Sequence, residues 1–150
     1  MTGIILNLST EFLIDIEIKD PRVSVMLELD FGIPWGFFDG VCQGHPPVCA
    51  VGVFLCINHN HYIHVCYSPE RGTNGRAEFI ALRTLLEIAS IKDVKKLQIM
   101  GDSKLVIDWA RKKATISDVR LEPLLRDIKH SMKSFEWFPS TTSLENSMRK

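Results

Sequence analysis

The strongest constraint on the fold is a switch of hydrophobic period in the middle of the chain. Residues 49–57 and 61–67 are rich in β-branched and aromatic side chains and read as two strands joined by a turn at residues 58–60. Residues 76–90 instead repeat their apolar side chains at helical spacing, at Ala77, Ile80, Ala81, Leu82, Leu85, Leu86 and Ala89. A strand pair followed by a helix of this length predicts an α/β domain.

The remaining elements follow from the same patterns. An aromatic strand at residues 35–39 is predicted to close at an Asp39-Gly40 turn, and residues 72–75 form a loop. Residues 97–100 predict a buried strand that turns at 101–103 into a helix, and residues 135–138 a last strand. The two later helices are expected at 104–113 and 121–133. The order predicts a mixed five-stranded sheet flanked by helices.

The composition fits one globular domain. The chain has 150 residues, 45% of them hydrophobic, and no apolar run approaches the ~20 residues of a membrane span. No basic residue precedes the short apolar stretch at residues 3–8, so no signal peptide is expected. We expect residues 1–34 to form a tether or an extra strand and residues 35–150 to form the domain.

Four cysteines, at positions 42, 49, 56 and 66, contain no Cys-x-x-Cys pair and lie in strand-like stretches. They are expected to be buried and reduced. Reduced thiols favour an intracellular location, nuclear or cytoplasmic.

Charge is distributed unevenly although the net charge is zero. Residues 1–90 carry 5 Lys and Arg against 10 Asp and Glu, a net of −5, whereas residues 91–150 carry 13 against 8, a net of +5. Two interpretations remain open: a basic half that faces a polyanion, or a set of solvated helix faces.

Three acidic residues occupy positions where an acid is costly. Asp39 shares a strand face with Trp35 and Phe37, Glu78 lies on the apolar face of the predicted helix, and Asp102 follows a buried strand at its carboxyl end. An ionised carboxylate near a core needs a cation or hydrogen bonds to compensate it. Divalent metal ions such as Mg²⁺ prefer such oxygen ligands.

Each acid also has a purely structural interpretation. Asp39 is a good residue for opening an Asp-Gly turn, and Glu78 suits the first turn of a helix. Asp102 or Ser103 suits an N-cap. Spacing alone does not decide between these interpretations and a metal site.

The residues around the three acids resemble the motifs of a known family. Phe38-Asp39-Gly40-Val41-Cys42-Gln43-Gly44-His45-Pro46-Pro47 resembles the first-strand motif of type 1 ribonuclease H domains of plant retroelements and the reverse-transcriptase-like family. Gly72-Thr73-Asn74-Gly75-Arg76-Ala77-Glu78-Phe79 and Gly101-Asp102-Ser103-Lys104-Leu105-Val106-Ile107 resemble the next two motifs, in the same order. The resemblance spans about residues 35–138 and implies the ribonuclease H-like fold.

The resemblance implies an endonuclease that hydrolyses the RNA strand of RNA–DNA hybrids with two Mg²⁺ or Mn²⁺ ions. Asp39 would bridge the two ions, and Glu78 and Asp102 would each support one. Contacts to the hybrid, through its backbone shape and 2′-hydroxyls, are expected from Gly40, Gly44, Thr73, Asn74, Gly75, Arg76 and Ser103. The domain is expected to act as a monomer, without a membrane.

The sequence departs from the family's pattern in two places. His45 and Gly75 stand where the family often has Asn. The family's closing motif, which carries a fourth metal-site acid, has no counterpart after Phe138, so we expect the C-terminal helix to be missing through truncation or a frameshift. The alternative function is therefore a catalytically impaired remnant of the fold that still binds nucleic acid. A third interpretation is a protein-interaction module.

Two further clusters were considered. His59, His61, His64 and Cys66 do not have zinc-finger spacing, and their alternation along a strand divides them between two faces. Trp109, Arg111, Lys112 and Lys113 combine an aromatic ring with basic residues. They either rest on phosphates or represent a core tryptophan beside a solvated helix end.

Overall fold

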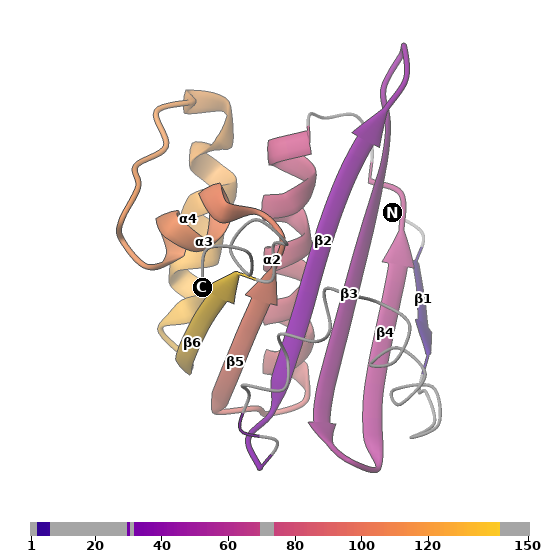
Figure 1. Ribbon diagram of the computed structural model, residues 1–150, viewed down its shortest axis with the longest axis vertical. Coiled ribbons are helices and arrows are strands. Elements are labelled where there is room, and N and C mark those ends of the chain that lie inside the picture. Colours follow the sequence, from indigo (N-terminus) through magenta and orange to yellow (C-terminus); the bar gives the residue numbers. More distant parts are fainter. Residues whose placement is uncertain (1–2, 7–29, 31, 70–73, 142–150) are drawn as a thin grey trace, which may run out of the picture.

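The computed structural model describes residues 3–6, 30, 32–69 and 74–141. Its strands form one mixed sheet in the order β1-β4-β3-β2-β5-β6 (Figure 1). The strands are β1 (Gly3–Leu6), β2 (Trp35–Gln43), β3 (Val48–Asn58), β4 (His61–Tyr67), β5 (Lys96–Gly101) and β6 (Glu136–Thr141). The five strands from β2 onward are those that the sequence predicts, and β1 adds an antiparallel edge strand beside β4.

The sheet changes direction at its centre. β2, β3 and β4 form an antiparallel meander, whereas β2 pairs with β5, and β5 with β6, in parallel. Parallel neighbours need a crossover, and α2 (Asn74–Ile91) supplies it between β4 and β5. This confirms the mixed sheet that the element order predicts.

The helices cover one face of the sheet. α2 packs on β2 and β3, while α3 (Lys104–Ala110) contacts β5 and β6 (Figure 1). α4 (Glu122–Met132), preceded by the 3₁₀ helix η2 (Val119–Leu121), packs against α2. Pro123 lies in the first turn of α4, where a residue without a backbone N–H is tolerated. No helix among the described residues is long and apolar enough to cross a membrane.

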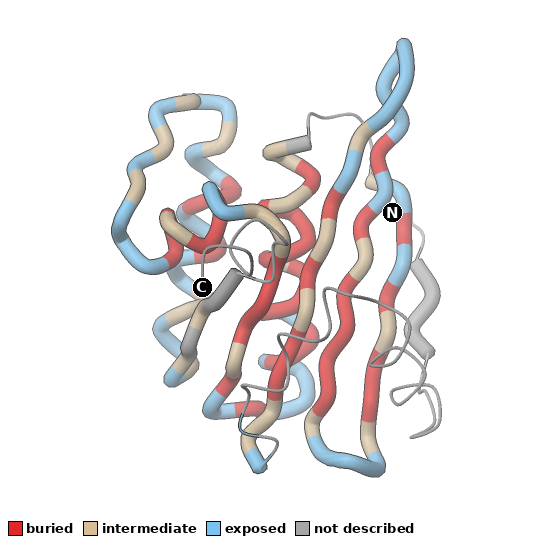
Figure 2. The backbone as a smooth tube through the Cα atoms, viewed as in Figure 1, coloured by how far each residue is buried: buried red, intermediate tan, exposed pale blue. Residues whose placement is uncertain are grey.

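Side chains alternate between two apolar clusters. The larger cluster lies between the sheet and the helices and includes Phe38, Leu55, Leu85 and Ile99. Figure 2 shows that buried residues are concentrated in the central strands and in α2. The second lies on the opposite face of the sheet and contains Trp35, Phe54, Cys56, Tyr62 and Met100. Since Phe38 points to the helices and Trp35 away from them, Asp39 belongs to the open face, as its two-residue spacing from Trp35 and Phe37 predicts.

Three boundary predictions were wrong. Asp39-Gly40 is not a turn, because β2 continues to Gln43 and pairs with β3 throughout. The helix expected to begin at Arg76 begins at Asn74, so Asn74 and Gly75 are helical rather than loop. The helix expected to reach residue 113 ends at Ala110, where Arg111 caps it and Lys112 adopts a φ of 64°. The motif residues Gly72 and Thr73 and the segment after Thr141 lie outside the described residues.

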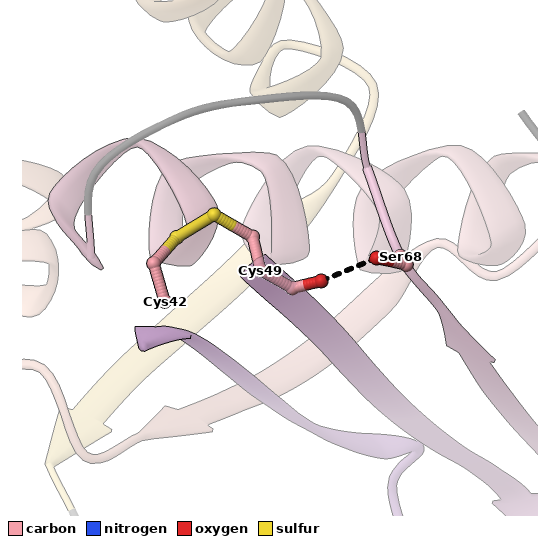
Figure 3. The surroundings of a disulfide bond; sticks show 3 residues. All are labelled: Cys42, Cys49 and Ser68. Atoms are coloured by element: carbon pink, nitrogen blue, oxygen red, sulfur yellow. Dashed lines mark hydrogen bonds between the residues drawn. A yellow bond between two sulfur atoms is a disulfide. The ribbon is translucent and has the colours of Figure 1, made fainter. Parts of the chain in front are cut away.

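The cysteine prediction was also wrong in part. Cys42 and Cys49 face each other across the β2–β3 hairpin and form a disulfide (Figure 3). Only Cys56 is a buried free thiol, since Cys66 is exposed. Because the intracellular location was inferred from reduced thiols, the disulfide removes that support, and the location stays a prediction.

Candidate active site

Two of the three predicted acids follow the last residues at which β2 and β5 pair. β2 and β5 run parallel, and Phe38 is paired with Gly101 at the end of their register. The residues that follow this pair are Asp39, in the middle of β2, and Asp102, directly after β5. The sequence predicted that Asp102 follows the carboxyl end of a buried strand. The parallel register of β5 with β2 places that position next to Asp39.

Gly40 brings the third acid to the same place. A Cβ atom built on Gly40 would lie 2.3 Å from the carbonyl carbon of Ala77 and 2.6 Å from the backbone nitrogen of Glu78. The first turns of α2 therefore lie directly on β2, which only a residue without a side chain allows. Because Asp39 precedes Gly40 on this strand, the backbone of Glu78 lies close to the strand segment that carries Asp39.

The electrostatics show that the three carboxylates interact. The pKa of Glu78 is raised above its ordinary value of 4.5, first by burial and also by the negative charges of Asp39 and Asp102. A hydrogen bond from Ser103 acts in the opposite direction. Burial and two neighbouring anions thus make this a site short of positive charge.

Ser103 has a role that the sequence did not reveal. Its hydroxyl oxygen accepts a hydrogen bond from the backbone N–H of Val106 at 3.3 Å, which caps α3. The same hydroxyl donates a hydrogen bond to the carboxylate of Glu78. Ser103 therefore connects the start of α3 to an acid on α2. The Gly-Asp-Ser motif signalled the cap, but nothing in the local sequence pointed to Glu78.

The carboxylate set has the chemistry of a hard-cation site without being a closed cage. Among the residues that the structure describes, no three His, Cys, Asp or Glu side chains are gathered closely enough to hold a metal ion by themselves. Mg²⁺ usually takes only one or two carboxylates and completes its shell with water and phosphate oxygens. Three half-buried acids, of which Glu78 has its pKa raised by burial and by the charges of the other two, fit such an ion.

The space beside the acids is open on the face away from the helices. A hollow of about 490 Å³ adjoins Asp39 and runs over β3 towards β4. Gly52 lies opposite Asp39 in the strand register, and a Cβ on Gly52 would meet nothing within 4 Å. A ligand can therefore approach Asp39 from the open face.

The other predicted contact residues are spread around this site. Gly75 and the half-buried Arg76 lie in the first turn of α2, close to Glu78 in the chain. Gly44, with a φ of 88°, lies in the exposed β2–β3 loop, five residues beyond Asp39. Gly40 is buried beneath α2, and Asn74 begins that helix. Thr73 lies outside the described residues.

The histidine and cysteine cluster and the basic cluster at Trp109 lie in different surroundings. His64 and Cys66 share the open face of β4, where the ring Nε2 of His64 lies 3.0 Å from the sulfur of Cys66. Burial lowers the pKa of His64. Trp109 is 8% exposed and packs edge-on against Phe79 with ring centroids 5.3 Å apart, so it is a core residue.

Comparison with known proteins identifies the family. The reverse transcriptase-like family model matches residues 37–142, which include all three acids. The chain belongs to this family. No curated protein matches the sequence, but solved structures of ribonucleases H share the fold of this reverse transcriptase-like domain.

The first of these is ribonuclease H1 from the halophilic archaeon Halobacterium salinarum NRC-1, with 25% identity, a TM-score of 0.67 and coverage of 79% of this chain and 91% of that one. The N-terminal ribonuclease H domain of a Mycobacterium tuberculosis protein has 19% identity and a TM-score of 0.66, with coverage of 72% and 84%. LC11-RNase H1, solved in complex with an RNA/DNA hybrid, has 19% identity and a TM-score of 0.65, with coverage of 77% and 89%.

Proposed function

We propose that this domain is a nuclease that hydrolyses the RNA strand of RNA–DNA hybrids with the help of Mg²⁺ or Mn²⁺. The observation that carries the proposal is the meeting of Asp39, Glu78 and Asp102 at the junction of β2, β5 and α2. The family match and the similarity to ribonuclease H1 structures, one of them bound to a hybrid, support it. A retroelement origin is part of the proposal and rests on the wording of the motifs.

The residues of the site would divide the work as follows. Asp39, Glu78 and Asp102 would hold two divalent ions, and when bound the ions supply an activated water and stabilise the leaving oxygen. Ser103 holds the carboxylate of Glu78 through its hydroxyl. The hollow over Gly52 leaves the approach to Asp39 clear. Gly44, Thr73, Asn74, Gly75 and Arg76 are proposed to contact the hybrid.

The proposal is tested with a hybrid whose RNA strand is labelled at one end. Purified protein with Mg²⁺ should release RNA fragments with 5′-phosphate ends, and EDTA should prevent this. Asp102→Asn should lower the rate by about 100- to 1000-fold, the usual effect of removing one electrostatic stabiliser of a transition state.

Asp108→Asn provides a matched control, because Asp108 lies on α3 outside the site and pairs with Lys104 at 2.8 Å. The Asp108→Asn variant should cleave the hybrid at the parent rate. Equal loss in both variants would mean that α3, rather than the carboxylate of Asp102, was damaged. Hybrid binding with a steep salt dependence and no cleavage by the parent protein would refute the nuclease proposal and support a binding remnant instead.

A further inference from the structure

We propose that the hollow between α3, α4 and β6 is a docking site for an acidic peptide segment of a partner protein. This lysine-rimmed hollow has a volume of about 430 Å³. Its lining includes the carboxyl end of α3, whereas Asp102 precedes the amino end of that helix. It is lined by Trp109, Ala110, Lys112, Lys129, Met132, Lys133 and Trp137.

The floor of the hollow is apolar and firmly held. Trp109 and Ala110 are buried, and Phe79 fixes the indole of Trp109 from the core side. Met132 and Trp137 are only half-buried, so their apolar surface remains available to a ligand. Tryptophan and methionine are enriched at protein interfaces, where they accept apolar anchor residues.

The rim carries positive charge that the described part of the chain does not neutralise. Lys112, Lys129 and Lys133 make no ion pair with any described residue, and no acid lines the hollow. Lys129 lies over the ring of Trp109, 5.9 Å from its centroid. Nearby arginines differ, since Arg126 pairs with Glu122 at 3.2 Å and Arg120 with Asp118 at 3.0 Å.

Apolar floor and cationic rim together specify the ligand. An apolar side chain between two carboxylates satisfies both, because it buries carbon against Trp137 and Met132 while its neighbours meet the lysines. A nucleic acid duplex satisfies only the rim, since phosphates carry no apolar group and paired bases cannot enter a hollow of this size.

A labelled synthetic peptide tests the docking site by fluorescence anisotropy. The probe is Glu-Glu-Phe-Glu-Leu-Glu-Glu, blocked at both termini and carrying fluorescein. One control peptide replaces Phe and Leu with Ser, and a second replaces every Glu with Lys. We expect saturable binding of the probe and at least about tenfold weaker binding of both controls.

Charge reversal in the protein locates the binding. Lys129→Glu and Lys133→Glu should each weaken peptide binding about tenfold or more. Lys113→Glu is the matched control, because Lys113 is exposed, directly follows Lys112 in the segment after α3 and does not line the hollow. Circular dichroism should show unchanged folding, and hybrid cleavage should be unchanged in all three variants.

Three outcomes would overturn the proposal. Equal binding of the serine peptide would show attraction by charge alone, and equal loss in Lys113→Glu would show that the hollow is not the site. Displacement of the probe by unlabelled hybrid, with hybrid binding lost in Lys129→Glu, would make this a nucleic-acid surface. Because peptide binding requires no catalysis, the result is independent of the nuclease proposal.

Discussion

Single residues determine whether the three carboxylates can meet, and glycine matters as much as the acids. Asp39, Glu78 and Asp102 were found from motifs, because strand and helix patterns alone gave each of them an equally good structural interpretation. The role of Gly40 in the contact between α2 and β2 was not predictable, because the Asp39-Gly40 pair has the local preference of a turn. Only the packing of α2 on β2 shows that Gly40 is needed for contact.

Gly40→Ala should therefore destabilise the fold. The added methyl would lie 2.3 Å and 2.4 Å from the carbonyl carbon and oxygen of Ala77, and backbone atoms cannot move aside as a flexible side chain can. Overpacking of this kind costs about 1–3 kcal/mol, and α2 would carry Glu78 away from Asp39. Urea unfolding measures the first effect and the rate of hybrid cleavage the second.

Gly52→Ala serves as the control, since a methyl at Gly52 meets nothing within 4 Å. Its free energy of unfolding should stay within about 1 kcal/mol of the parent value. If both alanine variants were equally stable, the close approach of α2 to Gly40 would be contradicted.

Among the elements, the β2–β3 hairpin departs most from what the sequence indicated. Helix α2 and strands β3, β4 and β5 were predictable because their apolar periods are regular over many residues. The length of β2 was not, because its pairing with β3 and β5 overrides the turn preference of Asp39-Gly40. The extended register sets Cys42 opposite Cys49, a pairing that sequence spacing alone does not show.

Thiol counting on the native protein checks this hairpin. Without reductant, Cys66 should react with a thiol reagent because it is exposed, although burial of the thiol raises its pKa. Cys56 should stay unreacted, since it is buried and its pKa is raised to about 11. The expected result is one fast thiol in the native state and two after unfolding.

Reduction should then expose all four thiols in denaturant and lower the free energy of unfolding by about 2 kcal/mol, as expected for opening a loop of this size. A Cys42→Ser, Cys49→Ser double variant should match the reduced protein and still show one fast native thiol. Three or four fast thiols in the untreated parent would instead support the reduced cysteines that the sequence indicated.

At the scale of the whole molecule, the site couples elements that are distant in the chain. Asp39 comes from β2, Glu78 from α2 and Asp102 from the end of β5, so the carboxylates meet only when the crossover is complete. The family resemblance implied that the three acids form one site. Ser103 could not be connected to Glu78 from sequence, because their contact depends on how α3 leaves β5.

This coupling should make the stability of the metal-free domain depend on pH. The pKa of Glu78 is raised in the folded state above 4.5, so the folded protein holds this proton more tightly than the unfolded chain. The stabilisation is fully present below pH 4.5 and is lost as the pH rises through the folded-state value. Above that value Glu78 is ionised and is repelled by the charges of Asp39 and Asp102.

Glu78→Gln mimics the protonated side chain and should remove this loss. Its free energy of unfolding, measured with urea and EDTA, should exceed that of the parent at pH 7, and the difference should shrink towards pH 4. Mg²⁺ should raise the melting temperature of the parent more than that of the variant, since bound cations replace the missing proton. Glu87→Gln is the control, because Glu87 is an exposed acid of α2 that faces Arg83 at 3.7 Å. Its stability at pH 7 should not exceed that of the parent, and Mg²⁺ should raise its melting temperature as much as that of the parent. Parallel pH profiles for the parent and Glu78→Gln would mean that the three acids do not share one electrostatic site.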